Sequence, residues 1–358
     1  MLSWNVLRPS APVPGRHGRD AVAVIRRLEP QEILTDRFGR VVRYLRVSVT
    51  DRCNLRCSYC MPNGPEHWEA LEDHLTAAEL ERVLQVAARL GIDRVRLTGG
   101  EPLTRSDIVE IAERIGAIPG IRDLSITTNG VFLGRLAAPL RRAGVNRVNV
   151  SLDSLDPHVF ASITGRDRHH DVLAGIEAAV AVGLDPVKLN IVALKGVNAG
   201  EVLDFVAFAA ETGVMLRFIE EMPMGHDAWH PDQYLSCEAI RERIEAVYPL
   251  EPVDDVIGNG PARNFRVRGT ATRIGFITPI SASFCPACNR MRLTPDGFIR
   301  PCLSPCDEFD LRVPLRNGGD DDAIAEVFRR AMIIKPERHE FQWETPVVMF
   351  RTMSQIGG

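Results

Sequence analysis

Hydrophobic and polar residues alternate in six short segments between residues 43 and 223, and helical stretches separate these segments. Alternation of this kind is typical of β-strands that cover one face with apolar packing. The expected strands span residues 43–50, 94–100, 123–130, 147–154, 186–196 and 215–223. Strands that alternate with helices predict a parallel sheet with right-handed crossovers.

The first intervening helix carries clear boundary signals. It begins after Thr76, a good N-cap with Glu79 three residues later, and it ends at Gly91. Helical periodicity predicts further helices over residues 106–117, 169–183 and 199–213.

The polar positions of the six strands form a second face with an excess of basic residues. Arg46, Arg96, Lys188 and Arg217 belong to it. Buried arginine and lysine need anionic or hydrogen-bonding partners, so this face should line a binding site. A complete eight-stranded barrel fills its interior with branched apolar side chains. A polar inner wall on six strands therefore predicts an incomplete (β/α)6 barrel of the TIM type around a large polar ligand. An open sheet with one solvated face is the alternative, but it leaves the covering helices hard to place.

The pattern changes after residue 226. Short apolar segments at residues 264–269, 272–281 and 289–303 predict antiparallel strands, and residues 321–335 predict one helix. The first residues contain prolines and arginines with little periodicity, which is typical of disorder. We therefore expect a disordered extension over 1–34, a partial barrel over 35–226 and a β-rich region over 227–358 that caps the barrel.

Composition narrows the function classes. Hydrophobic residues make up 45% and charged residues 25% of the 358 residues, which are ordinary globular values. A formal net charge of −4 gives no basic footprint for nucleic acid. No apolar run approaches the roughly 18 residues of a membrane span, and no secretory segment is evident. We expect a cytoplasmic protein that binds neither nucleic acid nor membrane.

Eight cysteines without an export signal point to metal or redox chemistry rather than to disulfides. Six of them form two sets of three, namely Cys53, Cys57 and Cys60, and Cys285, Cys288 and Cys302. Of the two that remain, we expect Cys237 to be an ordinary buried thiol. The other is Cys306.

Three cysteines in a set leave one metal coordination site open. A structural zinc site takes four protein ligands, and no histidine lies between residues 231 and 338 to supply one. A four-iron, four-sulfur cluster usually takes one cysteine for each iron, so three cysteines leave one iron free to bind an outside molecule. Zinc with a distant fourth ligand, or Cys306 as the fourth ligand of the second set, are the alternatives.

The first set resembles a known superfamily. CxxxCxxC after a first strand, with Tyr59 before the last cysteine, resembles the radical S-adenosylmethionine superfamily, and so does "TGGEP" at residues 98–102. In that superfamily the open iron binds S-adenosylmethionine, and an electron from the cluster releases a 5'-deoxyadenosyl radical. The resemblance implies that the first cysteine set holds this cluster. It also implies that the following residues contact S-adenosylmethionine: Tyr59, Gly100, Ser151 and Met222.

The second set narrows the resemblance. "FCPACNRMRLTPDGFIRPCL", together with "TTNG", "VNVSLDS", "RFIEEMPMG" and the terminal "IGG", is similar to the GTP 3',8-cyclase family from about residue 35 onward. This family is also called molybdenum cofactor biosynthesis protein A. The resemblance implies a second four-iron, four-sulfur cluster on Cys285, Cys288 and Cys302 that binds the guanine of GTP. In that family the adenosyl radical takes hydrogen from C3' of the ribose, and C3' then attacks C8 of the guanine. The product is (8S)-3',8-cyclo-7,8-dihydroguanosine 5'-triphosphate, made in the first step of molybdenum cofactor biosynthesis.

The same resemblance implies which residues contact the substrate. The GTP contacts are Arg46, Arg96, Thr127, Lys188, Arg290 and Arg292. Three of these, Arg46, Arg290 and Arg292, are expected to be catalytic, with Arg94 and Arg217 as helpers. The terminal Gly357 and Gly358 would enter the active site as a slender tail. The chain has no GxxxxGK[ST] loop, so GTP is not held as in GTPases.

Partners follow from the resemblance as well. The product would pass to cyclic pyranopterin monophosphate synthase. The sequence does not indicate which protein supplies the electrons, and it is compatible with a homodimer. One alternative is another two-cluster radical enzyme, such as a peptide-modifying maturase, although those usually carry more C-terminal cysteines. A non-enzymatic iron or zinc protein that acts as a scaffold or sensor is the other.

Overall fold

The computed structural model describes residues 33–61, 68–224, 229–253, 260–304, 306–341 and 351–357. The described residues belong to one compact unit that extends from Glu32 to the C-terminus. Nearly all of the expected N-terminal extension, residues 1–34, lies outside the described residues.

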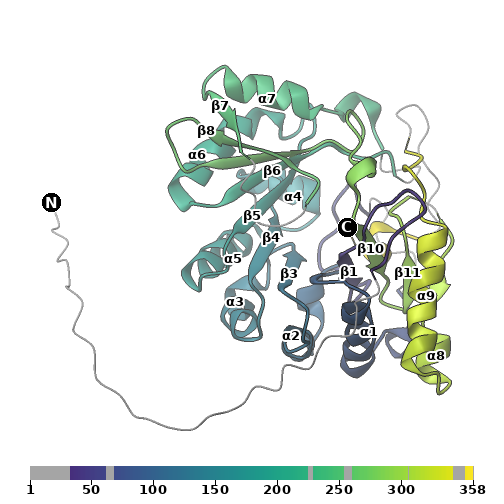
Figure 1. The fold of residues 1–358 in the computed structure, drawn as a ribbon. Coiled ribbons are helices and arrows are strands. Elements are labelled where there is room, and N and C mark those ends of the chain that lie inside the picture. Colours follow the sequence, from purple (N-terminus) through teal and green to yellow (C-terminus); the bar gives the residue numbers. More distant parts are fainter. Residues whose placement is uncertain are drawn as a thin grey trace, which may run out of the picture. The chain divides into compact units, whose positions relative to one another are not determined.

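Six parallel strands form the centre of this unit (Figure 1). They pair in chain order, each parallel to the next. The strands are β1 (Tyr44–Ser48), β2 (Arg94–Thr98), β3 (Asp123–Thr128), β4 (Arg147–Ser151), β5 (Val187–Val192) and β6 (Met215–Ile219). Every one lies inside a predicted segment, and the predicted incomplete barrel is confirmed.

Helices follow the strands and pack on their apolar side (Figure 1). These are α1 (Ala77–Arg89), α2 (Ile108–Gly116), α3 (Leu133–Arg142), α4 (Pro157–Thr164), α5 (His169–Ala181) and α6 (Val202–Thr212). The predicted start of α1 is confirmed, because the Glu79 amide donates to Thr76 Oγ1 and the Glu79 carboxylate accepts from the Thr76 amide.

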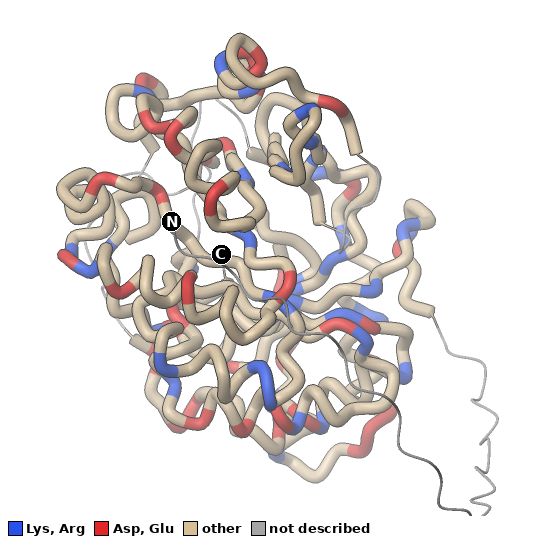
Figure 2. The backbone as a smooth tube through the Cα atoms, turned by 90° about the vertical axis from the view of Figure 1, so that its left-hand side faces the viewer, with Lys and Arg blue, Asp and Glu red and all other residues tan. Residues whose placement is uncertain are grey.

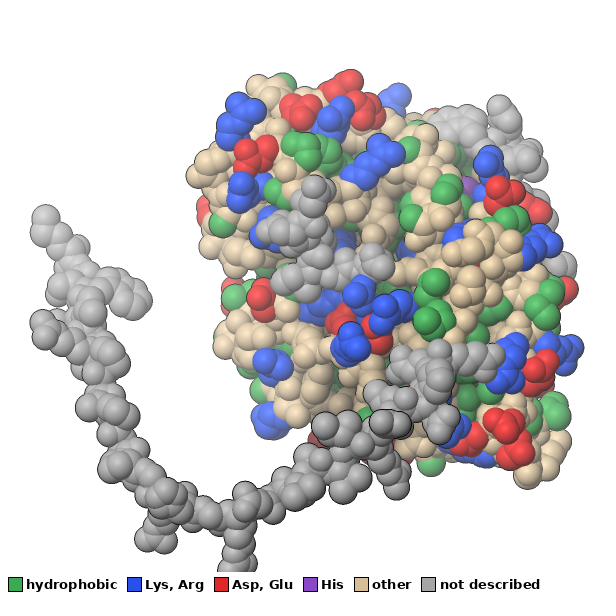
Figure 3. Space-filling view, in the orientation of Figure 1, with side chains coloured by type: hydrophobic (Ala, Val, Ile, Leu, Met, Phe, Trp, Pro, Cys, Tyr) green, Lys and Arg blue, Asp and Glu red, His purple; other side chains and the backbone are tan. Residues whose placement is uncertain are grey.

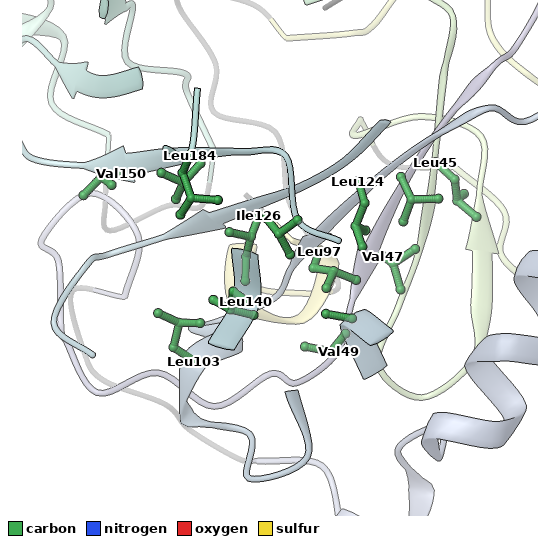
Figure 4. Close-up of a cluster of buried hydrophobic side chains, with 14 of the residues drawn as sticks. Leu45, Val47, Val49, Leu97, Leu103, Leu124, Ile126, Leu140, Val150 and Leu184 are labelled. Carbon is green, nitrogen blue, oxygen red and sulfur yellow. The ribbon is translucent and has the colours of Figure 1, made fainter. Parts of the chain in front are cut away.

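The two faces of the strands differ as predicted. Alternate apolar side chains of the strands, such as Leu45, Leu97 and Ile126, are fully buried in the core between strands and helices (Figure 4). The polar positions between them face the other way, and many are also buried. Asn149 is 1% exposed and Lys188 0%. The inner wall is therefore a polar surface that is removed from water.

The C-terminal region adds strands to both edges of the parallel array. It contributes β7 (Leu250–Pro252), β8 (Arg263–Val267), β9 (Arg273–Ile277), β10 (Arg290–Leu293), β11 (Phe298–Arg300) and β12 (Phe309–Asp310). The predicted antiparallel strands are confirmed by the pairing of β8 with β9 and of β10 with β11. Strands β7 and β12 also pair antiparallel, with β8 and β11, but they lie outside the predicted segments. The sequence did not predict that β9 pairs parallel to β6 and that β10 pairs parallel to β1.

The remaining helices surround these added strands. They are α7 (Cys237–Glu245), α8 (Arg312–Arg316), α9 (Asp321–Ile333) and the terminal α10 (Met353–Ile356). The predicted C-terminal helix is confirmed as α9, which packs against α1, β11 and β12. Among the described residues, no helix has the length and apolar character needed to cross a bilayer.

Candidate active site

The first cysteine set lies on the loop that follows β1. The amides of Cys60 and Met61 both donate to the Cys57 carbonyl, at 3.0 and 2.8 Å, so the loop curls around Cys57. The end of α4 holds the same loop, because the Arg56 amide donates to the Thr164 carbonyl at 2.8 Å. The loop thus presents its three sulfurs from a backbone that is fixed at several points.

A cavity of about 240 Å³ lies at the carboxyl ends of the strands, next to this loop. In parallel α/β folds this is where ligands bind. Its lining includes the three cysteines and residues from the ends of five strands, β2 to β6. The residues that the resemblance assigns to S-adenosylmethionine all belong to this lining, namely Tyr59, Gly100, Ser151 and Met222. Thr127, assigned to GTP, lines the same cavity.

The two glycines after β2 allow the chain to pass close to the cysteine loop. A Cβ on Gly99 would lie 2.2 Å from the Thr50 carbonyl oxygen, and one on Gly100 would lie 2.4 Å from that of Asp51. No side chain fits at such distances. The Gly100 amide donates to Thr50 O and the Glu101 amide donates to Arg52 O, each at 2.8 Å. The "TGGEP" turn and the cysteine loop are therefore one packed unit.

Glu101 anchors this unit to β3. Its buried carboxylate accepts hydrogen bonds from the Thr128 hydroxyl at 2.7 Å and from the amides of Asn129 and Leu103 at 2.6 and 2.9 Å. Burial raises the pKa of Glu101 to about 7, although these hydrogen bonds oppose the shift. The Asn129 side chain in turn approaches Cys53, with Nδ2 at 3.9 Å from Sγ.

Asp153 positions Tyr59 at the other side of the cavity. The Tyr59 hydroxyl donates to Asp153 Oδ2 at 2.7 Å, while Oδ1 accepts from the Val192 amide at 2.8 Å. Burial raises the pKa of Asp153 to about 6. Sequence reasoning quoted the segment that contains Asp153 but assigned this residue no role.

The chemistry of the first cysteine set fits an iron–sulfur cluster. Burial raises the pKa of Cys53 to about 11 and that of Cys60 to about 12, so a positive partner is needed to hold these groups as thiolates. In the part of the chain that the structure describes, no three His, Cys, Asp or Glu side chains converge as ligands of a single metal ion. Three cysteines on one loop are the donor set of a four-iron, four-sulfur cluster that leaves one iron open.

The second cysteine set lies beside β10. The short 3-10 turn η5 (Cys285–Ala287) and the following Cys288 lead directly into β10, and Cys302 follows β11. Although burial opposes it, the charges of Lys335 and Arg290 lower the pKa of Cys288 to about 7. The Cys306 thiol donates to the Cys302 carbonyl at 3.8 Å, and burial raises the pKa of Cys306.

Parallel pairing of β10 with β1 brings the arginines of the second set to the inner wall. Arg292 pairs in register with Arg46, which pairs in register with Arg96 on β2. Figure 2 shows Lys and Arg positions in the middle of the tube drawing, and Figure 3 shows such side chains gathered near the middle of one face. The predicted substrate residues of three neighbouring strands therefore lie side by side.

Charge repulsion and burial act together on this cation cluster. Burial, with the charges of Arg217, Arg147 and Arg96, lowers the pKa of Lys188 to about 6. Burial lowers the pKa of Arg46 to about 10. An anion that enters this wall would reverse these shifts, because it favours the charged forms.

The inner wall also contains buried polar atoms without a hydrogen-bond partner among the described residues. Among the described residues, several buried side-chain atoms of the inner wall make no hydrogen bond: Tyr44 Oη, Ser48 Oγ, Thr127 Oγ1, both amide atoms of Asn149, Asn190 Oδ1 and Arg217 Nε. Buried polar groups in proteins are nearly always paired, so this set fits a large polar ligand. Tyr44, two residues before Arg46 on β1, was not predicted as part of the wall, because a tyrosine at the start of a strand does not stand out as a polar position.

The C-terminal tail reaches the same wall. Gly357 has φ +75°, and a Cβ there would lie 2.3 Å from Ser48 Oγ. The guanidinium of Arg292 donates to the carbonyls of Ile356, at 3.2 Å, and Gly357. Met353 and Ser354 line the cavity beside the first cysteine set. Gly358 lies outside the described residues.

Comparison with known proteins agrees with this geometry. Residues 47–209 match the model of the "Radical SAM superfamily", and residues 214–341 match "Molybdenum Cofactor Synthesis C". In fold, the chain is similar to the crystal structure of Streptococcus suis SuiB bound to S-adenosylmethionine. The TM-score is 0.53 at 16% identity, over 76% of this chain and 62% of that chain. The fold and the cysteine loop thus define a protein of the radical S-adenosylmethionine class.

Sequence relatives narrow the class. The GTP 3',8-cyclase of Moorella thermoacetica is 48% identical over 91% of this chain and 100% of its own length. Those of Heliobacterium modesticaldum and Listeria monocytogenes are 46% and 45% identical, with the same coverage of both chains. The chain belongs to the GTP 3',8-cyclase family.

Proposed function

We propose that this protein is a GTP 3',8-cyclase that converts GTP into (8S)-3',8-cyclo-7,8-dihydroguanosine 5'-triphosphate for molybdenum cofactor biosynthesis. One observation carries the proposal. The cysteine-lined cavity and the buried cation cluster lie on the same polar inner wall, where Thr127 belongs to the cavity and the neighbouring Ser125 contacts Arg96. A radical source and a polyanion site are thereby adjacent, as this reaction requires.

The first cysteine set would hold a four-iron, four-sulfur cluster with S-adenosylmethionine. When bound, this pair supplies the electron and the 5'-deoxyadenosyl radical that removes hydrogen from the substrate. The protein's own residues orient the cofactor: Tyr59 is held by Asp153, and the glycine turn lets backbone groups approach closely. Asn129 and the Leu55 amide donate toward Cys53 and thereby stabilise its thiolate.

The cation cluster would hold the triphosphate. Arg46, Arg96 and Arg292 lie on adjacent strands in register, so their guanidinium groups can bind several phosphate oxygens at once. Lys188 and Arg217 lie on β5 and β6, farther along the same wall. The pKa of Lys188, lowered to about 6, is what is expected of a group that becomes fully charged at neutral pH only when an anion is bound.

The second cysteine set would hold a second four-iron, four-sulfur cluster that fixes the guanine base. Arg290 and Arg292 extend from this set into the wall, and they link base binding to triphosphate binding. We propose that Arg46, Arg290 and Arg292 act in catalysis by holding the ribose between the two clusters. We further propose that cyclic pyranopterin monophosphate synthase takes the product.

A peptide-modifying maturase with two clusters is the second candidate. The relatives at 45–48% identity and the buried, strongly basic wall disfavour it, because a peptide substrate has no need of such a concentration of positive charge.

Anaerobic turnover tests the proposal directly. The reconstituted protein is incubated with dithionite, S-adenosylmethionine and GTP deuterated at C3'. We expect deuterium in 5'-deoxyadenosine and a cyclised nucleotide in equal amount. Cleavage of S-adenosylmethionine without transfer of the C3' deuterium would contradict the proposal.

A further inference from the structure

Lys335 is a buried lysine beside the second cysteine set. The chain contains only three lysines, Lys188, Lys195 and Lys335, among 43 lysines and arginines. Lys335 follows α9 and is 1% exposed. Lysine is therefore rare in this chain, and at this position its ammonium group is removed from water.

All three donors of this ammonium are used. Lys335 Nζ donates to the Pro301 carbonyl at 2.6 Å, to the Arg290 carbonyl at 2.8 Å, and to Cys288 Sγ at 3.7 Å. Pro301 immediately precedes Cys302, and Arg290 follows Cys288 by two residues. One side chain thus connects the two chain segments that carry two of the three cysteines.

The charge of Lys335 has one evident partner. Carbonyl oxygens carry no net charge, and no carboxylate pairs with Lys335 among the ion pairs of the described residues. A buried ammonium is costly unless an anion compensates it. The sulfur of Cys288, as a thiolate on a cluster, is the anion within reach.

Further contacts fix the segment that follows Lys335. The His339 amide donates to Cys285 Sγ at 3.4 Å, and His339 Nε2 lies 2.9 Å from the Pro279 carbonyl. Arg40 donates to the carbonyls of Cys285 and Pro336 at 2.9 and 2.6 Å. Residues 335–339 therefore contact the second cysteine set at both Cys285 and Cys288.

We propose that Lys335 is a positioning residue of the second cluster, which orients Cys288 and raises the reduction potential of that cluster through its charge and its hydrogen bond to the sulfur. The proposal rests on the proposed function, since it requires a cluster on the second cysteine set. Reduction adds negative charge to a cluster, and a neighbouring cation stabilises the more negative state. In the first cysteine set, by comparison, Cys53 Sγ accepts from the neutral groups of Leu55 and Asn129.

Potentiometric EPR on the reconstituted full-length protein tests the inference. Lys335→Met removes the charge and the donors, Lys335→Gln removes the charge but can still donate, and Lys195→Met is the same change at an exposed lysine. In both Lys335 variants we expect the midpoint potential of the second cluster to fall by at least about 59 mV, a tenfold change in the reduced-to-oxidised ratio. The potential of the first cluster, and both potentials in Lys195→Met, should not change.

The other possible results for the Lys335 variants also support or overturn the positioning role of Lys335. An unchanged second potential in Lys335→Gln with both clusters intact would overturn the inference. Loss of the second cluster's iron alone, with the first cluster and the thermal unfolding of the apoprotein unchanged, would support the positioning role. Global unfolding of both Lys335 variants would overturn it, since Lys335 would then be a general packing residue. If the wild-type protein holds a single cluster, the proposed function fails before any variant is compared.

Discussion

At the residue scale, the candidate site separates into groups that local sequence signals could identify and groups that they could not. Cys53, Cys57 and Cys60 follow one another within a single loop, so their spacing alone indicated a shared site. Lys335 and Tyr44 join the site only through strand pairing and helix packing. Their side chains give no local signal, because a lone lysine after a helix usually ends in solvent.

The second cysteine set should be separable from the first by one substitution. Cys285→Ser would remove a proposed ligand of the second cluster, and Cys285 does not line the first cavity. We expect it to retain cleavage of S-adenosylmethionine and to lower GTP cyclisation by about a hundredfold or more, as loss of substrate positioning does. Chromatography of 5'-deoxyadenosine and of the cyclised nucleotide measures both activities.

Cys306→Ser is the matched control. The Cys306 thiol faces the Cys302 carbonyl, so we expect both activities to persist. If Cys285→Ser keeps cyclisation, or if Cys306→Ser loses it, the second site has been assigned to the wrong cysteines.

Lys188 should make GTP binding depend on pH. Burial and neighbouring arginines lower the pKa of Lys188 to about 6, so above this pH the empty site holds the neutral amine. A bound triphosphate raises this pKa, so binding takes up a proton and weakens as pH rises above about 6, up to about tenfold for each pH unit. Calorimetry in buffers of different ionisation enthalpy measures the uptake between pH 7.5 and 8.5, above the titration of the nucleotide itself. An equal uptake in Lys188→Met would assign the proton to another group.

At the scale of elements, periodicity predicted the six barrel strands and the boundaries of α1, because both depend on neighbours along the chain. The parallel pairing of β9 and β10 could not be predicted this way. Arg290–Leu293 reads as an ordinary alternating strand, and its pairing with β1, some 245 residues earlier, depends on the whole barrel edge. Helix α3 was not predicted, since Pro139 lies inside it and proline normally interrupts a helix.

The turn after β2 should not accept a side chain. In Gly100→Ala the new Cβ would lie within 2.7 Å of backbone atoms of Asp51 and Arg52, so the cysteine loop must move. We expect a loss of about 1–3 kcal/mol in the free energy of unfolding and at least about a tenfold weaker binding of S-adenosylmethionine. Thermal unfolding and equilibrium dialysis measure these two quantities.

Gly200→Ala is the control for this change, because a Cβ at Gly200 meets no atom within 4 Å. It should leave both quantities unaltered. Normal binding of S-adenosylmethionine by Gly100→Ala would show that the close approach is not required.

At the scale of the whole molecule, the C-terminal region extends the barrel sheet at both edges. Strand β10 covers the edge of β1 and β9 covers the edge of β6, so the six parallel strands have no free edge in the described structure. The boundary predicted at residues 226 and 227 stays a prediction, and the two family models meet nearby, between residues 209 and 214.

Residues 35–226 expressed alone should therefore self-associate. Removal of β9 and β10 exposes the backbone groups of two parallel edges, which are templates for pairing with another chain. Size-exclusion chromatography with light scattering should show oligomers or precipitate, whereas the full chain should unfold in one cooperative transition. A stable, folded monomer of residues 35–226 would show that the two parts fold independently.

The central claim is that the protein holds two clusters, each on three cysteines. Each cluster would leave one iron open, the first to S-adenosylmethionine and the second to GTP. EPR of the reduced, oxygen-free protein tests this most directly, with about eight iron atoms expected per chain. We predict two cluster signals, of which one changes on addition of S-adenosylmethionine and the other on addition of GTP. A single cluster signal, or two signals that respond to neither molecule, would contradict the account.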